Sequence, residues 1–343
     1  MTDAVRNSFR TQADACLALG SPFTARILRL LADGLTPGTP VADRVLGWQG
    51  DPSGRADALA LRLAGGLHAL ALQSDPPALR SFYTNPSRHT DIEALAVLLD
   101  TTDHAPLMDW LASAPQTNEV RRSAPLIAAG HWLAARFGLP MVLSELGASA
   151  GLNLNWDRYA LDTGGGFGDQ NSPLRLTPDW RGAMPPSTQP QVTQRRAVDL
   201  NPLDVTRDSL RIRAYIWADQ PDRMALTQTA IDMAHGLQVD RADAVDWLET
   251  RLQTQHPGQL HLIYHTVAWQ YFSQTAQARG EALLQSAGNR ATASAPLAHL
   301  SLESDGAEPG AALTLRLWPG NHTIPLGRVD FHGRWVDWQA PPP

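Results

Sequence analysis

The amino-acid sequence predicts an α/β fold in which an all-helical N-terminal segment precedes a mostly parallel sheet with closing antiparallel strands. Three observations predict it. Apolar residues recur at helical spacing up to residue 138, strand-like runs alternate with helices from residue 141, and a glycine-rich crossover lies where the pattern changes. The 343 residues exceed one typical domain. We therefore expect a helical segment over 1–138 and an α/β domain over 139–343.

The N-terminal segment should contain several helices. Phe23, Ile27, Leu30 and Leu31 share one face of a helix, as the spacing of three and four residues requires. Breaks rich in proline and glycine separate the periodic stretches, at 37–40, 51–54 and 75–77. The last helix is expected to begin near Ser123, with Pro125 in its first turn, and to end at Gly138. This helix leads directly into the first strand.

The C-terminal part alternates strands with helices. Five apolar runs are expected to be parallel strands, and two later runs a closing antiparallel pair: 141–146, 195–199, 237–240, 260–266 and 297–303, then 312–318 and 327–338. The Gly/Pro-rich insertion at 162–190 should leave the main sheet and form a hairpin, because so long a loose loop is unusual in a compact domain.

The crossover at 139–159 joins an apolar strand, an acidic residue, glycines and a helix start. In open α/β sheets the crevice at the carboxyl end of such a strand binds ligands. Glu145-x-Gly147-x-x-x-Gly151-x-Asn153 resembles the first motif of S-adenosylmethionine-dependent methyltransferases. The same loop also contains Gly147-Ala-Ser149-Ala-Gly151, the G-x-S-x-G pattern of a hydrolase nucleophile elbow. Such an elbow normally follows earlier strands, and none is expected before 141, which favours the methyltransferase-like Rossmann sheet.

Methyl transfer requires a site that holds and orients the cofactor, because S-adenosylmethionine carries the activated methyl group itself. Carboxylates would bind the ribose hydroxyls and the adenine amino group, and backbone groups of the glycine loop would bind the amino-acid end. Three acidic residues follow three successive expected strands. The expected cofactor contacts are Glu145, Gly147, Ser149, Gly151, Asn153, Asp199 and Asp243.

His265 lies at the end of the fourth expected strand, where methyltransferases place groups that face the substrate. An imidazole titrates near neutral pH, so His265 could accept a proton from a hydroxyl or amine nucleophile. The alternative is a core histidine bonded to a backbone carbonyl. His261 lies four residues earlier, but no carboxylate ligands accompany this pair and no metal is expected.

Composition excludes several chemistries. The chain contains no lysine, so a Schiff-base lysine and a Walker-type phosphate loop are excluded, and the single cysteine, Cys16, excludes an internal disulfide and a multi-cysteine metal site. The net charge of −6 argues against a nucleic-acid partner. The chain lacks the apolar stretch of a signal peptide or a membrane span, which predicts a cytoplasmic protein without membrane partners.

Four segments carry a resemblance over nearly the whole length: Gln-Thr-Asn-Glu-Val at 116–120, the glycine motif at 145–154, Asp-Leu-Asn-Pro-Leu-Asp at 199–204, and Trp-Ala-Asp-Gln at 217–220. The chain resembles the uncharacterised bacterial family called domain of unknown function 2332, whose sheet looks like a methyltransferase Rossmann fold. The leading hypothesis is an S-adenosylmethionine-dependent methyltransferase whose acceptor, a small molecule or a macromolecule, is unknown. The alternatives are a serine hydrolase using Ser149 with Asp243 and His265, and a non-enzymatic protein on the same fold.

Overall fold

The computed structural model describes residues 2–343, which divide into two compact units. The first unit comprises 2–117 and 207–228, and the second comprises 118–206 and 229–343. The sequence-based division into 1–138 and 139–343 differs from these two units in two ways. Residues 118–138 belong to the second unit, and the later segment 207–228 returns to the helical unit.

The first unit is helical, and its helices end near the breaks that the sequence contains. Pro40 and Pro77 each open a helix in the first turn, where a missing N–H costs nothing. The buried leucines of α2 and α4 form the centre of its core, among them Leu28, Leu31 and Leu63. The elements are α1 (Thr2–Ala18), α2 (Pro22–Gly34), α3 (Pro40–Leu46), α4 (Leu59–Gln73), α5 (Pro77–Thr84), η1 (Pro86–Arg88), α6 (Asp91–Thr101), α7 (Pro106–Ala112) and α9 (Ser209–Ala214).

Segment 207–228 is bonded into this helical unit by side chains that the sequence separates widely. Asp219 accepts hydrogen bonds from the Ser21 hydroxyl at 2.6 Å and from the Phe23 N–H at 2.9 Å, at the start of α2. The Nδ1 atom of His68 on α4 lies 3.0 Å from the carbonyl oxygen of Ala214. These contacts explain why a segment from the middle of the chain completes an N-terminal bundle. Helix α10 (Pro221–Met233) begins within this segment.

The second unit contains a nine-stranded sheet, and the predicted α/β fold class is confirmed. Five strands are parallel, in the order β7-β6-β1-β8-β9, and β10, β11 and β12 continue the sheet antiparallel, with β5 parallel to β12 at the edge. The chain proceeds from β1 outward to β7 on one side and then crosses to β8 on the other. The strand order therefore reverses between β1 and β8, where doubly wound sheets bind ligands.

The strand bounds agree closely with the expected ones except near the C-terminus. The sheet comprises β1 (Met141–Leu146), β5 (Asp179–Gly182), β6 (Val192–Asp199), β7 (Val239–Arg241), β8 (Leu260–Thr266), β9 (Leu297–Glu303), β10 (Ala311–Trp318), β11 (His322–Val329) and β12 (Trp335–Trp338). The prediction of one strand over 327–338 was wrong. Asp330 accepts bonds from the N–H groups of His332 and Arg334, and Gly333 adopts a φ of 67°, so the chain turns there.

Part of the insertion forms a small second sheet, but the expectation that the whole insertion leaves the main sheet was wrong, because β5 pairs with β12 at the edge of the main sheet. Strands β2 (Ala160–Asp162) and β3 (Gly166–Gly168) pair antiparallel as the expected hairpin, and β4 (Arg175–Leu176) pairs with β2. The crossover itself continues into the 3₁₀ segment η3 (Leu152–Arg158) instead of the expected α-helix. Asn155 interrupts η3 with non-helical dihedral angles, so no α-helix begins at the glycine loop.

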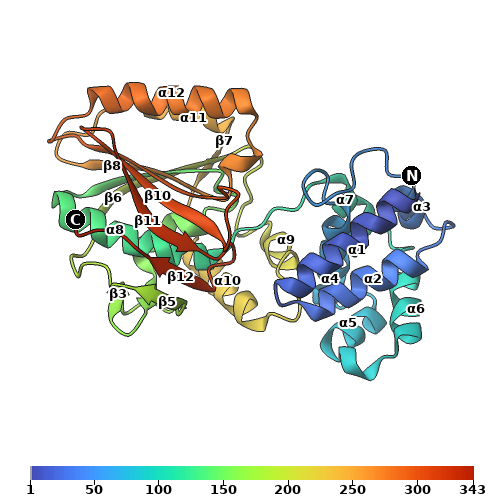
Figure 1. Cartoon of the computed structure of the whole chain (residues 1–343). Coiled ribbons are helices and arrows are strands. Elements are labelled where there is room, and N and C mark those ends of the chain that lie inside the picture. The colour runs from blue at the N-terminus through green and yellow to red at the C-terminus, as the bar shows by residue number, and fades with distance from the viewer. Residues whose placement is uncertain (1) are drawn as a thin grey trace. The chain divides into compact units, whose positions relative to one another are not determined.

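Helices cover both faces of the large sheet (Figure 1). One face packs on α11 (Ala244–Arg251) and α12 (Gln274–Arg290) through Leu146 and Ile263, and the other lies against α8 (Ser123–Phe137) and η3. Because successive side chains of a strand alternate, Ser144 faces the α11–α12 side and Glu145 faces the α8 side. No helix within residues 2–343 has the length and apolarity needed to cross a membrane.

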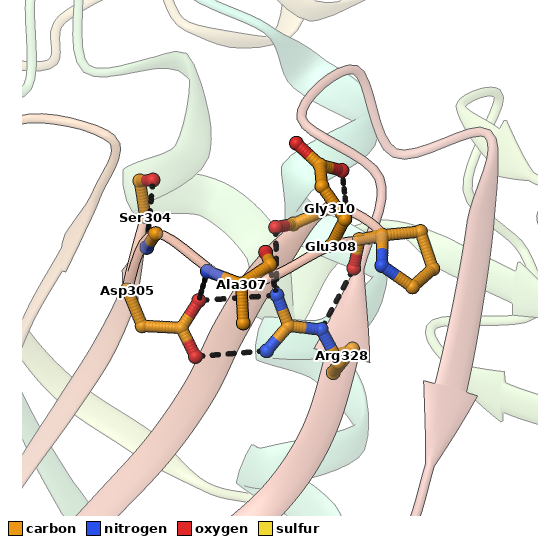
Figure 2. A network of polar contacts seen from close by, with 8 residues as sticks. Ser304, Asp305, Ala307, Glu308, Gly310 and Arg328 are labelled. Atoms are coloured by element: carbon orange, nitrogen blue, oxygen red, sulfur yellow. Dashed lines mark hydrogen bonds and ion pairs between the residues drawn. The ribbon is translucent and has the colours of Figure 1, made fainter.

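The loop between β9 and β10 is held by one arginine of β11 (Figure 2). Arg328 donates from Nη1 and Nη2 to the Asp305 carboxylate at 2.8 and 3.1 Å, and it also reaches the carbonyl oxygens of Ala307, Pro309 and Gly310. A planar guanidinium can satisfy these acceptors together, because its five N–H groups form a rigid fork. The loop directly after Glu303 is thereby fixed.

Replacing Arg328 by glutamine should loosen this loop without unfolding the sheet. The amides of 304–310 should exchange hydrogen on the order of ten times faster, because the loop loses the arginine that bonds its carbonyls and Asp305, and it then opens more often. Hydrogen exchange followed by mass spectrometry would measure this. Arg279→Gln is the matched control, since among residues 2–343 the Arg279 side chain bonds the carboxylates of Asp246 and Glu249 and no atom of the 304–310 loop. Equal exchange of 304–310 in both variants would contradict the assigned role.

Candidate functional site

The glycine loop after β1 forms a sharp turn at the point where the strand order reverses. Gly147, Ser149 and Gly151 all have positive φ angles, of 67°, 54° and 73°. The N–H groups of Gly147 and Ala148 both donate to the carbonyl oxygen of Val198, at 2.9 and 3.1 Å. A Cβ atom on Gly147 would lie only 2.6 Å from the Cβ of Ala268. Gly147 is therefore required by the turn and by the close approach of the loop that follows β8, which contains Val267 and Ala268 and is called the β8 loop below.

Asp199 ties the glycine loop to the end of β6. Its Oδ2 accepts the Ser149 N–H at 2.8 Å, and its Oδ1 accepts the Asn201 N–H at 2.8 Å. Ser149 is only 5% exposed, and its Oγ atom has no hydrogen-bond partner within residues 2–343. A buried hydroxyl without a partner is costly, so this group is available to a ligand that would satisfy it.

Glu145 is buried beneath the loop on the same face of the sheet. The Tyr264 hydroxyl donates to its Oε2 at 3.3 Å and lies equally far from the carbonyl oxygen of Asn153. Burial raises the pKa of Glu145 to about 8, helped by the nearby charge of Asp199 and opposed by the Tyr264 bond. Most of this carboxyl group is therefore protonated at pH 7. A buried group with so strongly shifted a pKa, beside the turn where the strand order reverses, is a candidate functional residue.

Asn153 is held by the segment that precedes α8. The Ser123 hydroxyl donates to its Oδ1 at 2.8 Å, and its Nδ2 donates to the Glu119 carbonyl at 3.2 Å. Asn118 accepts the Leu152 N–H at 3.0 Å. The side chain of Asn153 is thus engaged by the protein, and its cofactor contact stays a prediction that this geometry does not favour. Asn118 and Glu119 belong to the Gln-Thr-Asn-Glu-Val motif at 116–120, which the sequence analysis had singled out.

Asp243 lies at the end of β7 and caps α11. Its Oδ1 accepts the N–H groups of Val245 and Asp246 at 2.8 and 3.1 Å, and the residue is exposed. The preceding residue, Ala242, donates its N–H to the Asp199 carbonyl at 3.2 Å. Glu145, Asp199 and Asp243 consequently end three neighbouring strands at one edge of the sheet.

His265 lies on the opposite face from Glu145 and is buried. Its Nδ1 is 2.7 Å from Glu303 Oε1, its Nε2 is 3.0 Å from His299 Nε2, and its ring stacks on Trp269 with centroids 4.9 Å apart. Both ring nitrogens are engaged. Its role as a proton acceptor therefore stays a prediction that the geometry does not favour, and a triad with Ser149 and Asp243 is not assembled.

Glu303 was missed by the sequence analysis, although it is an acidic residue at the end of β9. Its Oε1 accepts the N–H groups of Ala268 and Trp269, at 2.8 and 3.0 Å, besides its bond to His265. Burial opposes ionisation, but these bonds prevail and lower the pKa of Glu303. The carboxylate holds the β8 loop, in which Val267 has a φ of 55°, against Gly147. A β-branched residue at positive φ is strained, and strain of this kind is often found at functional sites.

No cluster of three metal-ligating side chains occurs within residues 2–343. Four groups could hold an organic ligand: the Ser149 hydroxyl, the carboxyl groups of Glu145 and Asp199, and the Oδ2 atom of Asp243. They surround the turn at which the strand order reverses. The arrangement can bind a polar molecule along the strand ends and offers no covalent triad.

The fold and the site define a doubly wound α/β protein with a glycine-rich crossover at the point where the strand order reverses. The chain belongs to the family described as "Uncharacterized protein conserved in bacteria (DUF2332)", whose model matches residues 6–338. No curated protein and no solved structure matches the chain significantly.

Proposed function

We propose that this protein is a methyltransferase that binds S-adenosylmethionine at the Gly147–Gly151 loop and methylates a small-molecule or macromolecular acceptor. The observation that supports this most is the pairing of Asp199 with the Ser149 N–H directly beside the unpartnered Ser149 hydroxyl. This places a carboxylate, a free hydroxyl and a tight backbone turn together at the reversal of strand order.

The chemistry of the site residues fits the cofactor. A carboxylate such as that of Asp199 can accept a ribose hydroxyl as well as N–H groups, since two oxygens offer about four lone-pair positions. The exposed Asp243 has its Oδ2 free for the adenine amino group. A sulfonium near Glu145 would favour the ionised carboxylate, because an opposite charge lowers the pKa of an acid. The cofactor supplies the methyl group, and these residues bind and orient it.

Calorimetric titration with S-adenosylhomocysteine tests the proposal. The wild-type chain should bind with a Kd on the order of micromolar, and Asp199→Asn should bind at least about 30-fold more weakly, because the amide cannot accept from two N–H groups and a ribose hydroxyl together. Asp162→Asn, an exposed acid of the insertion, is the control and should bind normally.

Thermal unfolding of each variant separates loss of binding from loss of the fold. If the wild-type protein does not bind the cofactor, the methyltransferase proposal fails, and labelling of Ser149 by a fluorophosphonate would then favour a hydrolase. Absence of both responses would favour a non-enzymatic role.

A further inference from the structure

A second polar cluster lies at the opposite end of β8, on the α11–α12 face of the sheet. The Oγ atom of Ser144 accepts bonds from Nε and Nη2 of Arg251, each at 3.2 Å, and lies 2.9 Å from Nε2 of His261. Because an arginine only donates, the serine proton goes to His261 Nε2, and this ring carries its proton on Nδ1. The cluster is thus rich in N–H donors.

Two guanidinium groups here have no carboxylate partner. Across the described part of the chain, neither Arg251 nor Arg290 has a carboxylate oxygen within 4 Å, whereas the neighbouring Arg196 and Arg279 form ion pairs. Arg290 donates to the carbonyls of Ser286 and Leu252. The nearby Asp240 is bonded to Arg196 and to the Trp247 indole. The region therefore carries excess positive charge.

A small cleft of about 30 Å³, open to solvent, lies beside His256 and His261. Its polar lining residues are Thr254, Gln255, His256, His261 and Arg290, and the rest of its lining is apolar. The His256 ring packs edge-on against His261 with centroids 4.8 Å apart. The Nε2 atom of His256 is buried and bonds to no atom of residues 2–343. A buried ring nitrogen without a partner, at a cleft that Arg290 also lines, is a group that a ligand could satisfy.

We propose that this cleft binds a phosphoryl group, as inorganic phosphate or a phosphate monoester. A tetrahedral oxyanion accepts several N–H bonds at once and is attracted by guanidinium charge. In this site His256 and Arg290 donate hydrogen bonds to the phosphoryl oxygens. Arg251, which is bonded to Ser144, attracts the anion through its positive charge without touching it. The site lies at the amino end of β8, away from the glycine loop at the carboxyl end, and does not depend on the methyltransferase proposal.

Calorimetric titration of the full chain at constant ionic strength tests this site. Inorganic phosphate or glycerol 3-phosphate should bind saturably at one site, and His256→Ala should weaken binding on the order of tenfold. No side-chain hydrogen bond of His256 occurs within residues 2–343, and its carbonyl keeps the Gln259 N–H in the alanine variant, so the substitution should leave the fold intact, which thermal unfolding checks. His235→Ala, an exposed histidine of the same unit, is the control and should bind normally.

The two ligands distinguish the sources of the phosphoryl group. Tighter binding of glycerol 3-phosphate indicates a phosphate ester, and equal or tighter binding of inorganic phosphate indicates the free ion. Absence of saturable binding by either, or equal affinity of His256→Ala and the wild type, overturns the proposal.

Discussion

Replacing Gly147 by alanine should abolish cofactor binding and destabilise the second unit. The new Cβ would sit at positive φ and 2.6 Å from the Ala268 Cβ. The strained backbone costs about 1 kcal/mol and the overlap a further 1–3 kcal/mol, because a packed core cannot absorb an added methyl group without shifting. Denaturant unfolding would show the loss, and titration with S-adenosylhomocysteine would show no binding.

Gly258→Ala provides the matched control for this prediction. Gly258 also has a positive φ, of 77°, but no atom lies within 4 Å of where its Cβ would be. Its substitution should therefore cost only the backbone term, about 1 kcal/mol. The double variant Gly147→Ala with Ala268→Gly should recover part of the lost stability. Equal losses for the two single variants would contradict the contact with Ala268.

Replacing Glu145 by glutamine should remove a pH dependence of stability. The pKa of Glu145 in the folded protein is about 8, above its ordinary value of 4.5, because burial disfavours the charged form. Between these values the folded state keeps a proton that the unfolded state has released. The free energy of unfolding therefore falls as the pH rises from about 4.5 to 8, and the whole effect is about 4 kcal/mol at most.

Denaturant unfolding across this pH window would measure the effect. The glutamine variant is neutral throughout, so its stability should change less from pH 5 to 8, and it should exceed the wild type most clearly near pH 8. Glu249→Gln, on the exposed surface of α11, should keep the wild-type slope. If the free energy of unfolding of Glu145→Gln changed with pH as steeply as that of the wild type, Glu145 would not be the source of the pH dependence.

Local patterns predicted most of the sheet. The bounds of β1, β8 and β9 match the expected runs, because strands buried on both faces are near-continuous apolar sequences. The turn at Asp330 was missed, since it depends on one carboxylate accepting bonds from its own turn. The glycines of the crossover were identified, because a tight turn needs positive φ wherever the loop lies.

The sequence by itself determined the fold class, the glycine turn and the acidic residues at three strand ends, because these depend on local periodicity and on backbone conformation. Only the tertiary structure decided what each side chain contacts. It paired Asp199 with the Ser149 N–H, left the Ser149 hydroxyl unpartnered, and engaged both nitrogens of His265 with Glu303 and His299. The residues of these pairs are far apart in the chain and meet only when neighbouring strands pair in the correct register. Local sequence patterns do not specify that register.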